Sequence, residues 1–450
     1  MKDNTHLGSD HRDIIVTNLY RQAEAIANRV VSKQTEPAFK WDKILDDIAT
    51  SRLFGYPLML LLLGAVFWIT LAGANYPSAV IADFLFGIEA KLLQFATAAN
   101  IPEWIPGLFV KGMYRTLAWV VAVMLPPMAI FFPLFTLFED LGYLPRVAFN
   151  LDYLFKKCGT HGKQALTMCM GFGCNAAGIT SCRIIDSPRE RLIAMLTNNF
   201  VPCNGRFPAL ILIASIFMVG IAPGPLNSMS TVSIIVGLIL FGIIITLAVS
   251  YLLSKTLLKG IPSTFTLELP PYRPPQMGRV IITSIMDRTI FVLGRAVMVA
   301  APAGMIIWLM ANIHVGGISL IAVIARWLDP FAKAIGLDGL ILMAFILGLP
   351  ANEIVVPIMV MSYLSTGAMM EMGSLQEMRT LLVSNGWTWL TALNMMLFSL
   401  LHYPCSTTLI TILKETKSKK WTFLAFLIPT LVAVAVCFLV AQTVYYFGWA

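Results

Sequence analysis

Apolar segments long enough to cross a membrane recur along this chain. The hydrocarbon core of a bilayer is about 30 Å thick, which a helix spans with about 20 residues. Only helices and closed barrels cross it, because backbone groups find no water there. Composition agrees: 58% of the residues are hydrophobic and 12% are charged, against about 25% charged in soluble domains. The sequence predicts an all-α polytopic membrane protein with spans at residues 54–74, 116–138, 192–219, 231–253, 285–310, 387–413 and 421–446.

Basic residues indicate on which side of the membrane each loop lies. Lys and Arg are enriched in cytoplasmic loops, and here they cluster at residues 146–163, 183–191 and 414–420. We therefore place these loops in the cytosol, which leaves the C-terminus outside. The net charge of +8 then reflects topology and not nucleic-acid binding.

The N-terminal part of the chain divides into a polar and an apolar portion. Residues 1–52 lack the early apolar run of a signal peptide, and residues 14–31 have helical periodicity, so we expect a cytosolic linker helix. After the span at 54–74, residues 76–108 are too charged to cross the membrane. We expect them to form short interfacial helices on the outside.

Two broken segments lie inside the apolar regions. Residues 165–179 are too short for a comfortable span and have basic loops on both sides, so they must enter and leave on the cytosolic side. The segment is expected to be a re-entrant hairpin with its tip near GFGC (171–174). The stretch GLPANEI (348–354) is expected to be its outer counterpart, and residues 318–335 an interfacial helix.

The order span, hairpin, span, span therefore occurs twice, in opposite orientations. Such inverted repeats are common in transporters and place the site at the repeat interface. Pro202-Cys203 and Pro404-Cys405 lie at equivalent points of the two halves, and proline removes a backbone donor there. The expected divisions are 1–52 (linker helix), 53–114 (first span and external segment), 115–255 (first repeat), 256–282 (cytosolic loop) and 283–450 (second repeat).

Sulfur, amide and carboxylate groups gather at these breaks. Polar groups at membrane depth are tolerated where they are buried in protein or line a cavity. Sulfur with oxygen ligands suits a transition metal, and a path needs weak, exchangeable ligands. The candidate metal ligands are Cys174, Cys203, Cys405, Glu353, Asn175 and Asn204.

Other polar residues have simpler explanations. His402 is expected to be a packing histidine, and Arg206 to cap a helix C-terminus or to pair with Glu139 or Asp140. The basic loop 183–191 is topological or a docking point for a partner. Cys158, Cys169, Cys182 and Cys437 are expected to be small apolar fillers.

Eight motifs, in this order and spacing, resemble the membrane domain of the ferrous-iron transporter B (FeoB) family, with its two Gate repeats. They are FEDLGY (138–143), HGK (161–163), GFGCN (171–175), DSPRER (186–191), PCNGRFP (202–208), LELPPYR (267–273), GLPANEI (348–354) and YPC (403–405). The resemblance covers roughly residues 20–445 and implies Fe(II) uptake across a prokaryotic cell membrane, with Fe(II) as transported substrate and no resident cofactor. It also implies that Cys174, Cys203, Cys405 and Glu353 are metal-path positions.

The chain departs from the family pattern in three places. Members usually begin with a GTPase domain, whereas no G-x-x-x-x-G-K-[ST] loop occurs here. We therefore expect a separate GTPase partner and a small Feo accessory protein, and leave homo-oligomerisation open. Ala177 stands where Pro is usual, which makes Gly178 the expected hairpin breaker. Asn352 stands where Lys is usual.

Three functions compete on these grounds. The first is an Fe(II) permease, either an alternating-access carrier or a gated channel, with Mn(II) and Zn(II) as other candidate ions. The second is an organic-solute or nucleoside-type transporter, which the few, sulfur-rich polar groups disfavour. The third is a non-transporting membrane scaffold, which would not need paired Pro-Cys sites. An enzyme is not expected, because neither H-E-x-x-H nor a credible Ser-His-Asp set occurs.

Overall fold

The protein is almost entirely helical. The computed structural model describes residues 4–30, 46–51, 53–219, 225–260, 276–370, 372 and 374–448. Among these, six helices are long and apolar enough to cross a membrane, or seven if one bent pair counts as a span. The only strands seen in the described ranges form a small antiparallel hairpin, β1 (His314–Val315) with β2 (Ile318–Ser319). The prediction of an all-α polytopic membrane protein is confirmed.

The first half of the chain runs from an N-terminal helix to a long membrane helix, α11. The helical periodicity predicted near the N-terminus is confirmed as part of α1. The elements are α1 (Asn4–Val30), α3 (Gly55–Ala98), α4 (Trp104–Pro106), π-helical η1 (Gly107–Tyr114), α5 (Arg115–Asp140), α6 (Tyr143–Lys157), α7 (Lys163–Gly173), α8 (Asn175–Ser181), η2 (Cys182–Ile184), α9 (Pro188–Thr197), η3 (Asn198–Phe200), α10 (Phe207–Ile213), η4 (Ala214–Val219) and α11 (Pro225–Lys255).

The second half begins after a loop whose LELPPYR motif lies outside the described residues. A helix is present where residues 318–335 were predicted to form one: α14, which is bent by 111° against the helix that follows it. Its interfacial position stays a prediction. The elements are α12 (Met277–Thr283), η5 (Ser284–Ile290), α13 (Phe291–Asn312), α14 (Leu320–Ala334), α15 (Gly339–Leu347), η6 (Asn352–Ile354), α16 (Val355–Leu364), α17 (Leu375–Ser384), α18 (Trp389–Leu401), α19 (Ser406–Thr416) and α20 (Lys419–Tyr446).

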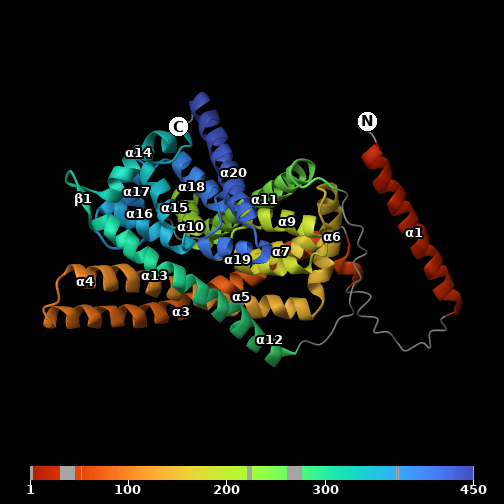
Figure 1. Ribbon diagram of the computed structural model, residues 1–450, viewed down its shortest axis with the longest axis horizontal. Helices are drawn as coiled ribbons and strands as arrows, with labels where there is room; N and C mark the ends of the chain where they lie inside the picture. The colour runs from red at the N-terminus through yellow and green to blue at the C-terminus, as the bar shows by residue number, and fades with distance from the viewer. Residues whose placement is uncertain are drawn as a thin grey trace.

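The expectation of short interfacial helices after residue 76 is wrong. Helix α3 continues without a break to Ala98, through Pro77. At about 1.5 Å per residue its 44 residues span about 66 Å, twice the hydrocarbon thickness. It packs along η1 and α5 to form the hairpin that projects at the left of Figure 1. Buried Glu89 is accommodated because Arg115 pairs with it at 2.8 Å.

The two halves repeat the same element order. Helices α5, α6 and the pair α7–α8 are followed by a broken helix and α11, just as α13, α14 and the pair α15–α16 are followed by a broken helix and α20. Both hairpins begin in the same way. Asp152 on α6 accepts a bond from the Gly162 amide at 2.8 Å, and Asp329 on α14 accepts one from the Gly339 amide at 3.1 Å.

The spans predicted at 192–219 and 387–413 are interrupted helices. The first unwinds between η3 and α10, and the second between α18 and α19. The two halves also pack on each other through their broken parts. Helix α8 contacts α19, α10 contacts α18, and η6 contacts α5, so the breaks lie in the middle of the molecule (Figure 1).

Candidate functional site

The residue at the break has nearly the same backbone conformation in both hairpins. Cys174, between α7 and α8, has φ −153° and ψ 125°, and Ala351, before η6, has φ −153° and ψ 127°. The expectation that Gly178 breaks the first hairpin is wrong, because Gly178 lies inside α8. Its role is spatial: a side chain there would approach the Asn198 amide within 2.5 Å.

The Pro-Cys loops bind the hairpin tips through their backbones. The amide of Asn204, just after Cys203, donates to the Gly173 carbonyl at 3.3 Å. The amide of Ser406, just after Cys405, donates to the Leu349 carbonyl at 2.8 Å. The equivalent amide of each half therefore ties its loop to the hairpin of the same half.

The three candidate cysteines occupy these breaks. Cys174 is buried, and Cys203 and Cys405 are half-buried. Cys203 accepts a long bond from the side-chain amide of Asn352, with Nδ2–Sγ 3.8 Å, which joins a loop of the first half to the hairpin of the second. The Cys405 thiol contacts Thr408 Oγ1 at 3.3 Å. The structure thus brings sulfur atoms from both halves to their interface.

Glu353 lies at the start of η6, next to the first Pro-Cys loop. Its carboxylate packs on the backbone of Gly205, where a Cβ atom would be 2.1 Å from Oε1. Its neighbour Asn352 contacts Cys203, and Gly205 lies two positions beyond that cysteine. No ion pair to Glu353 occurs in the part of the chain that the structure describes.

A group of asparagines packs behind the first hairpin. Asn175 donates to Asn199 Oδ1 at 3.1 Å, while its own Oδ1 is buried without a hydrogen-bond partner. Asn198 donates to the Asn175 carbonyl at 3.4 Å and fits between Gly171 and Gly178. Sequence reasoning missed Asn198, because only the folded hairpin shows that both glycines make room for its amide.

Arg206 caps a helix, which was one of its two predicted roles. It is 1% exposed and makes five hydrogen bonds to oxygens of Asn199, Leu400, His402 and Tyr403. Three of these acceptors are carbonyls at the C-terminal end of α18. A cation there satisfies orphan carbonyls and complements the helix dipole, so Arg206 of the first half fixes the break of the second.

His402 has the environment of a packing residue, as predicted. Its Nδ1 lies 3.0 Å from the carbonyl oxygens of Phe398 and Ser399. The ring stacks on Phe398 and meets Phe345 and Tyr403 at centroid distances of 4.9 and 5.0 Å. These contacts hold the unwound segment in place.

A pocket of about 330 Å³ leads to Glu353 from the side of the α16–α17 connection. Glu353, Asn352 and Gly205 form its inner end. Its other lining residues include the thioethers of Met370, Met372 and Met378. Sequence reasoning missed these methionines, because a chain with 24 of them gives no reason to single out three.

No cluster of three or more His, Cys, Asp or Glu side chains that could hold a metal ion occurs within the described ranges. The cysteines and Glu353 therefore do not form one closed ligand shell among the described residues. Weak, separated ligands are what rapid passage of an ion requires.

The basic loop at 183–191 is largely occupied by structural contacts. Arg183 pairs with Glu415 of α19 through two bonds of 2.8 and 2.6 Å, while Arg191 donates to the Ile185 carbonyl at 2.9 Å. Arg189 donates to the Leu258 carbonyl at 2.5 Å. The Arg183–Glu415 pair links the two halves beside α8.

Comparison with known proteins gives matches along most of the chain. The Gate model, described as "Nucleoside recognition", matches residues 121–217 and 293–419, which fall in the two repeats. The model "Ferrous iron transport protein B C terminus" matches residues 235–287 between them. No solved structure matches the chain.

Several curated relatives carry the name Fe(2+) transporter FeoB. One from Methanocaldococcus jannaschii is 26% identical over 95% of this chain and 62% of its own length, and one from Staphylococcus aureus is 27% identical over 93% and 61%. A Porphyromonas gingivalis relative, 27% identical over 89% of this chain and 51% of its own, is named an Fe(2+) transport protein A/FeoB fusion protein. The chain spans about three fifths of the length of the first two. Both repeats and their connection are matched, and the chain belongs to the FeoB family as its membrane portion.

Proposed function

We propose that this chain carries Fe(II) across the cell membrane, along a path at the interface of its two repeats. The observation that supports the path best is the contact of the first Pro-Cys break with the second hairpin at Asn352 and Glu353. Cys203 touches Asn352 of the opposite hairpin, and Glu353 packs on Gly205 beside it. A carboxylate at membrane depth is costly and usually functional, and here it lies at the end of an open pocket.

The ion would meet its ligands one after another. It would enter the methionine-lined pocket, reach the Glu353 carboxylate and pass to Cys203, whose loop packs against Glu353 at Gly205. Cys405 and Cys174 would follow, because the helices that begin just after them, α19 and α8, pack on each other. Asn175 adds a buried oxygen without a hydrogen-bond partner, and Asn204 lies on the loop that binds the first hairpin tip.

The choice of Fe(II) rests on the relatives, which are named Fe(2+) transporters. Mixed sulfur and oxygen ligands also suit Mn(II) or Zn(II), because availability and geometry decide the metal more than affinity does. Competition between these ions in one transport assay is therefore part of the test.

The membrane orientation follows from charge. Lys163, Arg183 and Lys414 lie at the ends of helices near the Arg183–Glu415 pair, and the cytosol would be on that side. The methionine-lined pocket would then open outward, with the N-terminus inside and the C-terminus outside. A separate GTPase-domain protein and a small Feo accessory protein would act from the cytosol. The Porphyromonas gingivalis relative, named as a fusion with Fe(2+) transport protein A, supports the small accessory partner.

Metal uptake into proteoliposomes tests the path. Cys203→Ser and Cys405→Ser should each slow Fe(II) entry, because a hydroxyl is a poorer ligand than sulfur for a borderline ion. The matched control is Cys437→Ser in α20, whose thiol donates to the Asn394 carbonyl at 3.6 Å, away from the breaks. Parental rates in both path variants would refute the cysteine path.

A nucleoside-type transporter is the second candidate, because the matching Gate model is described as "Nucleoside recognition". Its site would need several donors and acceptors for a base and a sugar. The pocket at Glu353 offers few polar side chains beyond Glu353, Asn352 and Ser374. Thermal stabilisation of the purified chain by nucleosides, without any effect of Fe(II), would favour this function over the first.

A further inference from the structure

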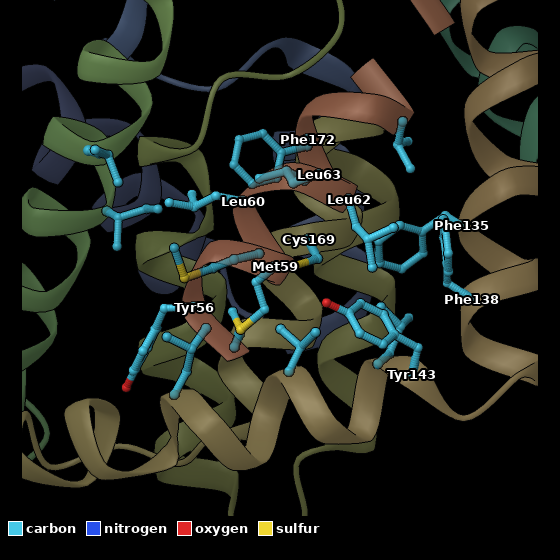
Figure 2. A pocket seen from close by; sticks show the side chains of 18 of the residues that line it. Tyr56, Met59, Leu60, Leu62, Leu63, Phe135, Phe138, Tyr143, Cys169 and Phe172 are labelled. Atoms are coloured by element: carbon cyan, nitrogen blue, oxygen red, sulfur yellow. The ribbon is translucent and has the colours of Figure 1, made fainter. Parts of the chain in front are cut away.

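A second cavity, of about 280 Å³, lies on the far side of the first hairpin (Figure 2). Its walls come from α3, α5, α6, α7 and α11, and nearly all of the lining surface is apolar. Figure 2 shows Met59, Leu63, Phe135 and Phe172 turned into this space, with the thiol of Cys169 beside them. The volume lies just below the range of small-ligand pockets, which are about 300–1,000 Å³.

The cavity lies between helices that leave a gap toward the membrane. Helix α3 packs along α5 and touches α6, whereas α11 packs on α9 and touches α6. Two lining residues on these helices are also exposed, Leu60 of α3 by 47% and Leu240 of α11 by 41%. Since α3 and α11 are both candidate spans, this side of the cavity would face hydrocarbon.

Polar contacts close the cavity at the end where α6 runs. The Tyr56 hydroxyl donates to the Asn150 carbonyl at 3.0 Å, and the Asn150 side chain donates to the Ala49 carbonyl at 2.7 Å. Arg146 pairs with Asp46 at 2.9 Å. These bonds tie α6 to the segment before α3, so the opening between α3 and α11 is the apolar one.

The inner wall supports the hairpin that carries Cys174. Met168 and Phe172 of α7 line the cavity and are 5% and 3% exposed. Phe131 of α5 also lines it and abuts Gly173, where a Cβ atom would be 2.4 Å from the Phe131 ring. Whatever fills the cavity therefore lies directly behind the hairpin tip.

We infer that this cavity binds one hydrocarbon chain of a bilayer phospholipid, which enters between α3 and α11. The surrounding bilayer supplies this ligand, and the apolar lining offers nothing to a polar one. An empty apolar cavity forfeits dispersion contacts on all its walls, and an inserted chain restores them. The lipid chain is then a structural partner of the α7–α8 hairpin.

Photolabelling of the full chain in liposomes tests this inference. The probe is a phosphatidylcholine with a diazirine midway along one acyl chain, and labelled peptides are mapped by mass spectrometry. Ordinary boundary lipid labels exposed residues such as Leu61, which is 66% exposed. Only a chain inside the cavity labels the buried residues of α7 at 165–172, and we expect label there.

Two variants and a control complete the test. Leu240→Trp obstructs the opening and Ala165→Phe fills the interior, and each should abolish the α7 label in protein that remains monodisperse. Leu61→Trp adds equal bulk on the outer face of α3 and should leave that label unchanged. Label confined to outward-facing residues of the parent, or α7 label that survives Leu240→Trp, would overturn the inference. Label from a diazirine fatty acid but not from the phospholipid would overturn the assignment to phospholipid.

Discussion

The two hairpins share a backbone but differ in the chemistry that they carry. In both, a backbone amide at the start of the hairpin donates a hydrogen bond to an aspartate of the preceding helix. In both, the residue at the break has nearly the same φ and ψ. At that break the first hairpin has Cys174 and the second has Ala351. The residue two positions beyond the break is Ala176 in the first hairpin, whereas Glu353 follows Ala351 and Asn352 in the second.

This difference teaches that the repeat gives both hairpins the same backbone geometry, whereas individual side chains make the two hairpins chemically different. In the proposed function, two equivalent unwound sites would give an ion a path through the middle of the molecule. The Glu353 carboxylate on the second hairpin and the buried Cys174 thiol on the first would make the two ends of that path chemically different. Arg206 adds to the asymmetry, because it belongs to the first half and caps a helix of the second.

The largest expected effect follows from removing that cap. Arg206→Met removes the arginine donor from the buried carbonyls of Asn199, Leu400 and Tyr403, and each such loss costs about 1–3 kcal/mol. The His402 carbonyl keeps its bond from the Asn199 side-chain amide. We expect a total loss of at least about 3 kcal/mol in the free energy of unfolding, measured by denaturant titration in detergent. Arg183→Met is the control, because that side chain is 67% exposed. Similar stabilities of the two variants would show that Arg206 does not hold the halves together.

The next effect concerns transport and compares the two hairpins directly. Glu353→Gln keeps the shape of the side chain but removes its charge, and we expect Fe(II) uptake to fall about tenfold, equivalent to about 1.4 kcal/mol. Cys174→Ala gives the first break the residue that the second already has, and should reduce uptake less. Initial rates in proteoliposomes measure both. A larger loss in Cys174→Ala than in Glu353→Gln would reverse the assigned asymmetry.

Sequence reasoning found the spans and the breaks because each has a local signal. Apolar length marks the spans, and Pro202 and Pro404 mark the unwound segments. The same reasoning failed for α3, where the charges of residues 76–108, Glu89 among them, suggested an end to the helix. Only the fold shows that Arg115, 26 positions away, neutralises Glu89 and lets the helix continue.

The candidate site was predictable in its residue types but not in its contacts. Sulfur and carboxylate at membrane depth are visible in the sequence, so Cys203, Cys405 and Glu353 could be selected. The contact of Glu353 with Gly205 joins positions far apart in the chain, and no local pattern encodes it. The same holds for Asn198, which fits the hairpin through Gly171 and Gly178.

A smaller effect tests whether the aspartate–amide bonds at the starts of the two hairpins contribute equally to stability. Asp152→Ala and Asp329→Ala each remove the acceptor for one amide at the start of a hairpin, which costs about 1 kcal/mol. We expect equal losses in the free energy of unfolding. Lys156→Ala and Lys333→Ala are matched controls, because they delete the ion pairs of the same aspartates and keep the amide bonds. Unequal losses from the two aspartate variants would break the equivalence.

The smallest effect tests the exposed link between the halves at Arg183 and Glu415. An exposed ion pair contributes about 0–1 kcal/mol, so Glu415→Gln should lower stability only slightly, although the pair is bidentate. The informative experiment is charge exchange, because α8 and α19 are in contact and the two side chains face each other. Arg183→Glu alone places two carboxylates together and should loosen this contact, while Arg183→Glu with Glu415→Arg should restore it. Melting of the purified protein at low and high salt measures the effect, and failure of the double variant to recover would mean that the pair does not join the two halves.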